Sequence, residues 1–99
     1  MMYAIEFLPE SQSDLMDIRR CLLQYYPSTS GNFFVLLRKK LDLLKNSPYA
    51  AQIYIKRPSY RRLVVGDYAV FYKVNEDKAL IQIYRMIHGS RDIERQLKN

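Results

Sequence analysis

The sequence predicts an α+β fold, in which a helical hairpin packs on one face of an antiparallel sheet. The first half of the chain carries apolar residues at helical spacing, and the second half carries them at the two-residue spacing of strands. Helices that precede a run of strands are typical of α+β domains. With 99 residues, 48% of them apolar, the chain is long enough to bury one core. We therefore expect residues 1–99 to form a single domain.

A strand and a helix are expected at the start of the chain. Residues 3–8 are rich in strand formers and read as an opening strand. Residues 10–26 follow a helical spacing, with Ser11 or Ser13 as the cap and Asp14 near the positive end of the helix dipole. The apolar face of this helix consists of Leu15, Ile18, Leu22 and Tyr25.

A second amphipathic helix is expected to run to about Asn46, where Pro48 closes it. Ser28, Thr29 and Ser30 are candidates for its N-cap. Its apolar positions are Phe34, Leu37, Leu41 and Leu44. The two helices form the predicted hairpin. The residues expected to face the sheet are Ile18 and Leu22 from the first helix and Leu37 and Leu41 from the second.

Three strands joined by tight turns are expected in the second half. Residues 49–59 include Pro58 and show no clear period, so we expect a surface loop there. The predicted strands are 60–65, 68–74 and 79–88, with turns at 66–67 and 75–78. Such an order gives an antiparallel meander. Residues 91–99 are expected to form a short charged helix or tail, with Asp92 in its first turn.

The charge of the chain favours acidic partners. It has 16 Lys and Arg residues against 10 Asp and Glu, a net charge of +6. Nucleic acid or a ribosome, an acidic protein segment and a membrane surface all fit, as does a basic surface that serves only solubility. The N-terminus does not read as a signal peptide, and no apolar run approaches the roughly 18 residues of a membrane span. A cytoplasmic protein without membrane contact is expected.

Several kinds of site are not expected. With three glycines there is no glycine-rich phosphate loop, and one Cys and one His are too few for a structural metal site. We expect no cofactor and no metal. The single cysteine, Cys21, cannot form an internal disulfide and is expected to be a small buried residue of the first helix. No nucleophile is linked to His88 by any hydrolase pattern.

Cations gather on and around the predicted strands: Lys56, Arg57, Arg61, Arg62, Lys73, Arg85, His88 and Arg91. Strand alternation places Arg85 on one face with Ile81, Ile83 and Ile87, and Tyr84 with His88 on the opposite face. An arginine among isoleucines is expected either to pair with a carboxylate, such as Glu6 or Asp67, or to open into a groove.

A cationic sheet with tyrosines suits RNA binding, and cleavage without a metal would need a general base and acid near the scissile phosphate. The titratable candidates for proton transfer are His88, Tyr72 and Tyr84, with arginines stabilising the developing charge. Core packing is the alternative role for the two tyrosines. A turn or capping hydrogen bond is the alternative role for His88.

Residues 60–74 and 83–93 resemble the C-terminal half of RelE/ParE toxins, and the order of elements extends the resemblance over the chain. The tyrosine-rich hairpin, the apolar third strand and the closing His-Gly-x-Arg-Asp carry it together. The resemblance implies a growth-inhibiting toxin of a type II toxin–antitoxin system, with a role in plasmid stabilisation. It also implies an antitoxin partner, which we expect to have an acidic segment.

The RelE/ParE family divides by target: RelE-like members cleave mRNA in the ribosome, and ParE-like members poison DNA gyrase. Ala69 stands where RelE-like nucleases usually carry an arginine, and no tyrosine follows Arg91. The ending from His88 to Asp92 looks more like the ParE branch. The resemblance therefore favours a gyrase binder. A ribosome-dependent endoribonuclease and an inactive relative that binds only its antitoxin remain the alternatives.

Each function uses its own set of residues. A nuclease on this sheet would use His88, Arg85, Arg61 and Arg91 as catalytic residues. A binder would contact its target or its antitoxin through Arg62, Tyr72, Arg91, Arg95, Arg38 and Lys39.

Overall fold

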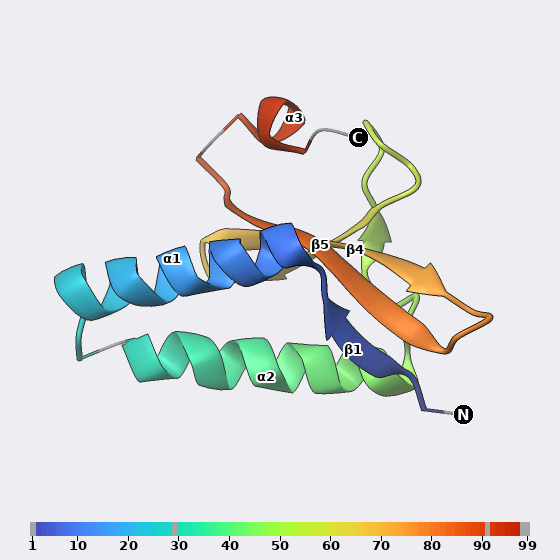
Figure 1. The fold of residues 1–99 in the computed structure, drawn as a ribbon, viewed down its shortest axis with the longest axis horizontal. Helices are drawn as coiled ribbons and strands as arrows, with labels where there is room; N and C mark the ends of the chain where they lie inside the picture. Colours follow the sequence, from blue (N-terminus) through green and yellow to red (C-terminus); the bar gives the residue numbers. More distant parts are fainter. Residues whose placement is uncertain (1, 29, 91, 98–99) are drawn as a thin grey trace.

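The computed structural model describes residues 2–28, 30–90 and 92–97. Over these residues the chain forms one five-stranded sheet with the strand order β1-β5-β4-β3-β2, together with three helices (Figure 1). The elements are, in chain order, β1 (Ala4–Phe7), α1 (Pro9–Tyr25), α2 (Ser30–Asn46), β2 (Gln52–Ile53), β3 (Arg61–Val65), β4 (Tyr68–Asn75), β5 (Leu80–His88) and α3 (Ile93–Gln96). The predicted α+β fold is confirmed.

The meander β3-β4-β5 is antiparallel, as predicted, and a further strand lies at each of its edges. β1 pairs with β5 in parallel, and β2 pairs with β3 in the antiparallel sense. The surface loop predicted for residues 49–59 is wrong at Gln52–Ile53, which pair with Arg62 and Arg61. Two residues are too few to show a period, so only the long-range pairing marks this strand.

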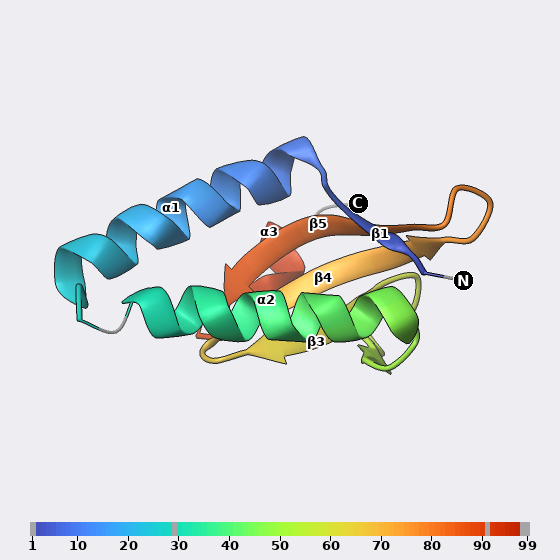
Figure 2. The ribbon, with the colours of Figure 1, turned by 90° about the horizontal axis from the view of Figure 1, so that it is seen from below.

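The helices α1 and α2 cover one face of the sheet (Figure 2). The core between the helices and the sheet consists of Ile18, Leu37, Leu41, Leu44, Val65, Val70, Tyr72, Ile81, Ile83 and Met86. The prediction that Ile18, Leu37 and Leu41 face the sheet is confirmed, and Leu22 packs against the same core while half-buried. The burial of these side chains fixes the hairpin on the sheet.

The start of α1 differs from the prediction. Its N-cap is Leu8, which makes no side-chain capping bond, and Pro9 occupies the first turn, where a missing N–H is tolerated. Ser11 is buried and donates from Oγ to the Leu8 carbonyl at 2.7 Å. The predicted caps Ser11 and Ser13 are therefore wrong. Of the caps predicted for α2, Thr29 lies outside the described residues.

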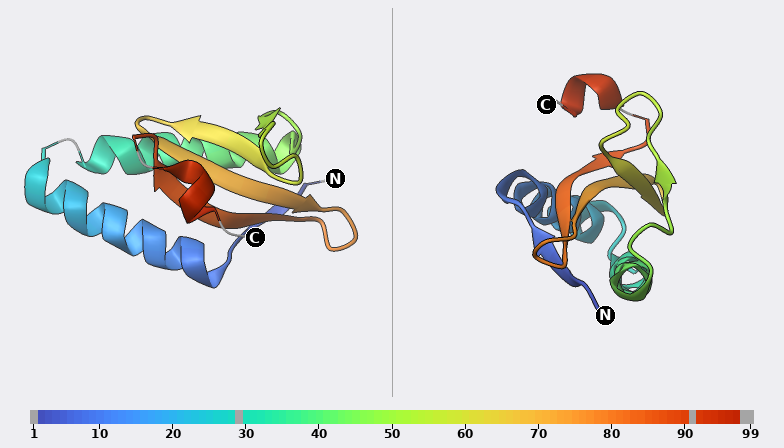
Figure 3. Two further views of the ribbon diagram at one scale, coloured as in Figure 1. Left: turned by 90° about the horizontal axis from the view of Figure 1, so that it is seen from above. Right: turned by 90° about the vertical axis from the view of Figure 1, so that its right-hand side faces the viewer.

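A smaller core lies on the opposite face of the sheet, under α3 (Figure 3). It consists of Tyr60, Ala69, Phe71, Ile87 and Leu97. Asp92, which was expected in the first turn of this helix, is instead its N-cap and accepts a hydrogen bond from the Arg95 N–H. The short helix covers a face of the sheet that would otherwise expose apolar side chains.

A β-bulge in β5 changes which residues share a face. Phe71 pairs with Arg85, but the next residue, Tyr72, pairs with Ile83, so Tyr84 is the extra residue. Ile81 and Ile83 therefore lie in the core under the hairpin, while Ile87 lies in the core under α3. The face predicted to hold Arg85 with these three isoleucines is wrong. Tyr84 and His88 do not share a face either, because Tyr84 packs on the smaller core and His88 packs against Tyr68 of the larger one.

The packing predicts a large effect at Leu41. Leu41→Ala should lower the free energy of unfolding by about 2–5 kcal/mol, because the side chain is 8% exposed and its loss leaves a cavity. Leu43→Ala, at a position 67% exposed on the same helix, is the control and should change it by less than about 0.5 kcal/mol. Urea denaturation measures both. Equal effects of the two substitutions would show that α2 packs with another face.

Candidate functional site

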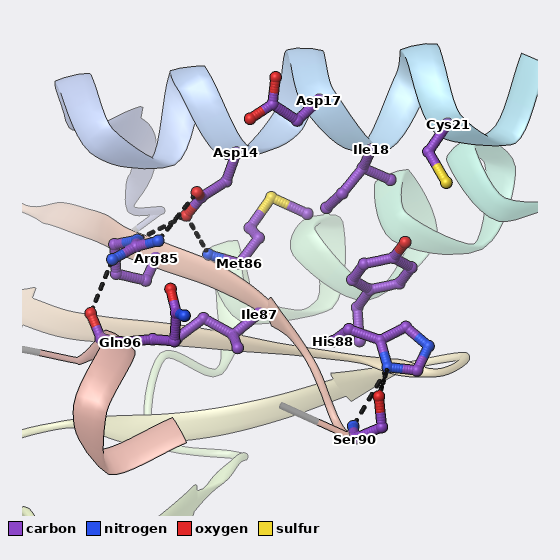
Figure 4. Close-up of a pocket in the computed structure, with 11 residues that line it drawn as sticks. Asp14, Asp17, Ile18, Cys21, Arg85, Met86, Ile87, His88, Ser90 and Gln96 are labelled. Atoms are coloured by element: carbon purple, nitrogen blue, oxygen red, sulfur yellow. Dashed lines mark hydrogen bonds and ion pairs between the residues drawn. The ribbon is translucent and has the colours of Figure 1, made fainter. Parts of the chain in front are cut away.

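A cleft of about 350 Å³ lies between α1 and the C-terminal half of β5, with α3 at one end (Figure 4). Polar side chains line it: Asp14, Asp17, Cys21, Tyr68, Arg85, His88, Ser90 and Gln96. The bulge in β5 lies beside this cleft. Arg85 and His88 are thus placed in one concave site.

Arg85 forms a bidentate ion pair with Asp14 of α1. Its Nε lies 2.7 Å from Asp14 Oδ2 and its Nη2 3.1 Å from Oδ1, while its Nη1 donates to the Gln96 carbonyl at 2.7 Å. The Met86 N–H donates to the same carboxylate at 2.9 Å. A pairing role for Arg85 was one of the two expectations, but the partner is neither Glu6 nor Asp67. Arg85 lies beyond Ile83, where the pairing of β5 with β1 ends, and it reaches Asp14 of α1 there.

The ion pair leaves Arg85 little capacity to bind a ligand. Its side chain is 19% exposed and that of Asp14 is 14% exposed. The hydrogen bonds with Asp14 raise the pKa of Arg85 above its ordinary value, so the guanidinium stays charged. Glu10 also lies 3.9 Å from Nη1. The charge of Arg85 is therefore neutralised within the chain.

His88 lies where β5 ends, with its ring edge-on to Tyr68 at 5.1 Å between centroids. Its Nδ1 accepts a hydrogen bond from the Ser90 N–H at 3.1 Å and lies 2.7 Å from Ser90 Oγ. This is the turn hydrogen bond given as the alternative to a catalytic role. With Nδ1 engaged in this turn, Nε2 is the ring nitrogen left for a contact outside the described residues.

Cys21 lines the cleft as an exposed residue of α1. The expectation that it is buried is wrong. The buried residues of α1 are Ser11 and Ile18, and Cys21 lies beside this narrow face, not within it. A helix that contacts the sheet along one row of residues leaves its flanking positions in solvent.

Arg61 lies far from the cleft. Its Nη1 donates to the carbonyls of Ala51 at 2.8 Å and Tyr49 at 3.2 Å, and its guanidinium lies 4.9 Å from the centre of the Tyr49 ring. On β4, the partner of Arg61 is Tyr72 and the partner of His88 is Tyr68. Four residues along a strand span roughly 13 Å. Of the four candidate catalytic residues, the structure brings together only Arg85 and His88, and Arg91 lies outside the described residues.

Tyr72 is a core residue. Its side chain is fully buried, and its hydroxyl donates to the Pro48 carbonyl at 2.9 Å. Burial raises the pKa of Tyr72, so the phenol stays protonated. The assignment of Tyr72 to a binding surface is therefore wrong. Tyr84, the other tyrosine considered for proton transfer, is half-buried and packs edge-on against Tyr60 at 5.3 Å.

Four of the predicted contact residues are exposed: Arg38, Lys39, Arg62 and Arg95. Arg62 lies 5.7 Å from the centre of the Tyr54 ring, and the Tyr54 hydroxyl donates to Glu94 of α3 at 3.0 Å. Tyr54 thereby brings Arg62 next to the helix that carries Arg95. Arg38 and Lys39 lie on α2, so these four residues lie on two separate surfaces.

Asp14 and Tyr54 are the residues of these sites that the sequence did not identify. Asp14 was assigned to the helix dipole, although it lies three residues after Ser11 and four before Ile18, on the buried side of α1. A carboxylate on the apolar side of a helix is a signal for a buried cationic partner. Tyr54 lies in the segment without a period and gave no such signal.

The described part of the chain contains no group of three or more His, Cys, Asp or Glu side chains placed to hold a metal ion. Within the same residues, no helix has the length and apolar character needed to cross a membrane.

Comparison with known proteins gives a family match. Residues 5–93 match the sequence profile of the ParE toxin of the type II toxin–antitoxin system parDE. No curated protein matches the sequence. Solved structures of toxin–antitoxin systems share the fold. The chromosomal ParDE toxin–antitoxin system from P. aeruginosa has a TM-score of 0.71 and 16% identity, over 88% of this chain and 96% of that chain. The toxin–antitoxin complex RelBE2 from Mycobacterium tuberculosis has a TM-score of 0.57 and 14% identity, over 89% of this chain and 99% of that chain.

Removal of the carboxylate from the ion pair should destabilise the protein. Asp14→Ala should lower the free energy of unfolding by about 3–5 kcal/mol, because it leaves Arg85 partly buried without its partner. Asp17→Ala, at a carboxylate that is 69% exposed and 3.4 Å from Arg20, is the matched control and should change it by less than about 0.5 kcal/mol. Guanidinium denaturation followed by circular dichroism measures both. The same midpoint for Asp14→Ala as for the wild type would contradict this role.

Proposed function

The chain belongs to the ParE toxins of type II toxin–antitoxin systems, and from this membership we propose that it inhibits growth by binding DNA gyrase, without cleaving a substrate. The observation that supports binding without cleavage is the bidentate ion pair of Arg85 with Asp14, at 2.7 and 3.1 Å. A nuclease would need this guanidinium to bind the phosphate of its substrate, but here it is already bonded to a carboxylate of the same chain.

The surroundings of His88 also support a binding function. Asp14 and Asp17 line the same cleft, so an incoming phosphate would meet two carboxylates. Arg61, which a nuclease would use to hold the substrate, is bonded to backbone carbonyls at the other end of the meander. His88 is held at Nδ1 by the Ser90 N–H, which leaves Nε2 for a hydrogen bond with a partner.

The surface that we propose for gyrase is the one formed by Arg62, Tyr54 and Arg95. Arg62 and Arg95 are exposed, and Tyr54 holds Arg62 beside α3. Arginines that lie on or near an aromatic ring, with their charge in solvent, are common anchors of protein interfaces. Arg91 and the α2 residues Arg38 and Lys39 were also expected to contact the target or the antitoxin.

Growth inhibition should be relieved by a partner. Expression of the chain alone should stop growth, and co-expression with its antitoxin should restore growth and yield a complex that co-purifies. The net charge of +6 favours an antitoxin with an acidic segment. Plating and size-exclusion chromatography measure the two effects. A chain that is harmless when overexpressed and purifies unbound would contradict a toxin function.

Replacement of His88 should separate binding from catalysis. His88→Gln keeps an acceptor for the Ser90 N–H but removes the titratable group, so a gyrase binder should remain toxic. The paired substitutions Arg62→Glu and Arg95→Glu should abolish toxicity, because they reverse charge on the proposed target surface. Growth assays, a gyrase supercoiling assay and an mRNA cleavage assay with ribosomes measure these outcomes.

Ribosome-dependent mRNA cleavage by the wild type that is lost in His88→Gln would overturn the binding function and establish the endoribonuclease. Antitoxin binding with neither cleavage nor gyrase inhibition would identify an inactive relative.

A further inference from the structure

The loop between β2 and β3 is an internally bonded projection from the sheet. Residues 54–60 form two consecutive turns, in which the Arg57 N–H donates to the Tyr54 carbonyl and the Tyr60 N–H to the Arg57 carbonyl, both at 2.9 Å. The Tyr54 N–H donates to the Tyr60 carbonyl at 2.9 Å and closes the loop at its base. Pro58 takes the second position of the second turn, where its fixed φ is favoured. The loop is thus held in one shape by its own backbone.

Two tyrosines anchor the base of this loop on the smaller core. Tyr54 packs edge-on against Phe71 at 5.1 Å between ring centroids, and its hydroxyl donates to Glu94 of α3 at 3.0 Å. Tyr60 is 4% exposed and packs edge-on against Tyr84. The loop therefore stands on the same side of the sheet as α3 (Figures 1 and 3). An anchored base leaves little conformational entropy for a partner to remove from the tip.

The tip of the loop presents a bare apolar side chain. Ile55 is 87% exposed, the largest fraction among the large apolar residues that the structure describes. The middle of a tight turn usually holds Gly, Pro, Asn, Asp or Ser, and an isoleucine there contributes no burial to the fold. Single exposed apolar residues are common on protein surfaces, so exposure alone assigns no role to Ile55. The charges around it distinguish this residue from the others.

Cations without anionic partners lie in and beside this loop. Lys56 follows Ile55 in the first turn and is exposed, and Arg57 is half-buried. Arg62 and Arg95, both exposed, lie at the base of the loop. Within the described part of the chain, none of these four cations forms an ion pair. Unpaired cations around an apolar tip fit a partner surface that is apolar in the middle and acidic at its rim.

A protein surface fits this loop better than the phosphates of a nucleic acid. Helix α3 carries two carboxylates, Asp92 and Glu94, next to Arg95. Phosphates repeat along a nucleic acid, so a strand bound here would meet these carboxylates as well as the cations. The rim of a protein pocket presents separate carboxylates, which can pair with individual cations. Interface hot spots lie in such water-excluding pockets, with other contacts around them.

We propose that Ile55 is the apolar anchor of the target interface and enters an apolar pocket of gyrase that has an acidic rim. Lys56 and Arg57 then pair with carboxylates of that rim, and Arg62 and Arg95 extend the charged contact toward α3. The bonded turns hold Ile55 outward before binding, so formation of the complex does not have to order the loop. The inference rests on the proposed function, because it names the part of the chain that recognises gyrase.

Truncation of the tip tests the anchor. Ile55→Ala should bind the gyrase holoenzyme at least about tenfold more weakly than the wild type and should inhibit supercoiling correspondingly less. Leu43→Ala, at an apolar residue of α2 that is 67% exposed, is the matched control and should bind as the wild type does. Surface plasmon resonance measures binding, and circular dichroism checks that both variants fold.

Two outcomes of this experiment separate the inference from the proposed function. Binding and inhibition by Ile55→Ala at the level of the wild type would overturn the anchor and leave the gyrase function standing. Failure of the wild type to bind gyrase would overturn the gyrase function and the anchor with it.

Charge reversal tests the acidic rim. Lys56→Glu should weaken gyrase binding about tenfold, because it places a carboxylate against the carboxylates of the rim. Lys78→Glu, at an exposed lysine in the turn between β4 and β5, makes the same change of net charge and should weaken binding less. Equal effects of the two substitutions would mean that gyrase responds only to the overall charge, and would overturn the proposed rim.

A fluorescent DNA duplex, without gyrase, tests the other acidic partner. Fluorescence anisotropy should show the same DNA binding for the wild type and Ile55→Ala, since a pocket for Ile55 exists only on the protein. Binding of the duplex by the wild type that is lost in both Ile55→Ala and Lys56→Glu would identify DNA as the occupant and overturn the protein pocket.

Discussion

The ion pair between Asp14 and Arg85 is the interaction on which the arrangement of the cleft depends. It joins α1 to β5, and through the Gln96 carbonyl it also holds α3. Apolar packing alone is not directional, so the hairpin and α3 could each shift on their faces of the sheet. A partly buried guanidinium with fixed donor directions removes that freedom. The same bonds neutralise the cation that a phosphate-binding site would need.

The bulge in β5 explains both what the sequence predicted and what it could not. The spacing of apolar residues predicted six of the eight elements with nearly correct ends, because that spacing reports which face of an element is buried. It also predicted the closing segment as a helix or tail. Alternation fails at one extra residue, Tyr84, and every assignment after it changes face. The partner of Arg85 could not be predicted either, because the contact with Asp14 joins residues 71 positions apart and depends on how α1 lies beside β5. β2 was missed because two residues carry no period.

The hairpin does more than bury the core. Gln12 from α1 closes one end of the free edge of β1, and Lys40 from α2 blocks the opposite edge at Val64. A sheet with two fully open edges would be prone to pair with other copies of itself. These two side chains engage backbone carbonyls at both edges of the sheet.

The distribution of the cations accounts for how a basic chain can act by binding alone. Arg61, Arg85, Lys40 and Lys73 are engaged within the chain, by backbone carbonyls, by Asp14 or by the rings of Tyr60 and Tyr84. Arg38, Lys39, Arg62 and Arg95 are exposed, and they lie outside the lining of the cleft that holds His88. These four lie on two surfaces, one on α2 and one beside α3, and Arg19, Arg20, Lys56 and Lys78 are exposed as well. A catalytic site would require the reverse, with free cations converging on the one titratable histidine.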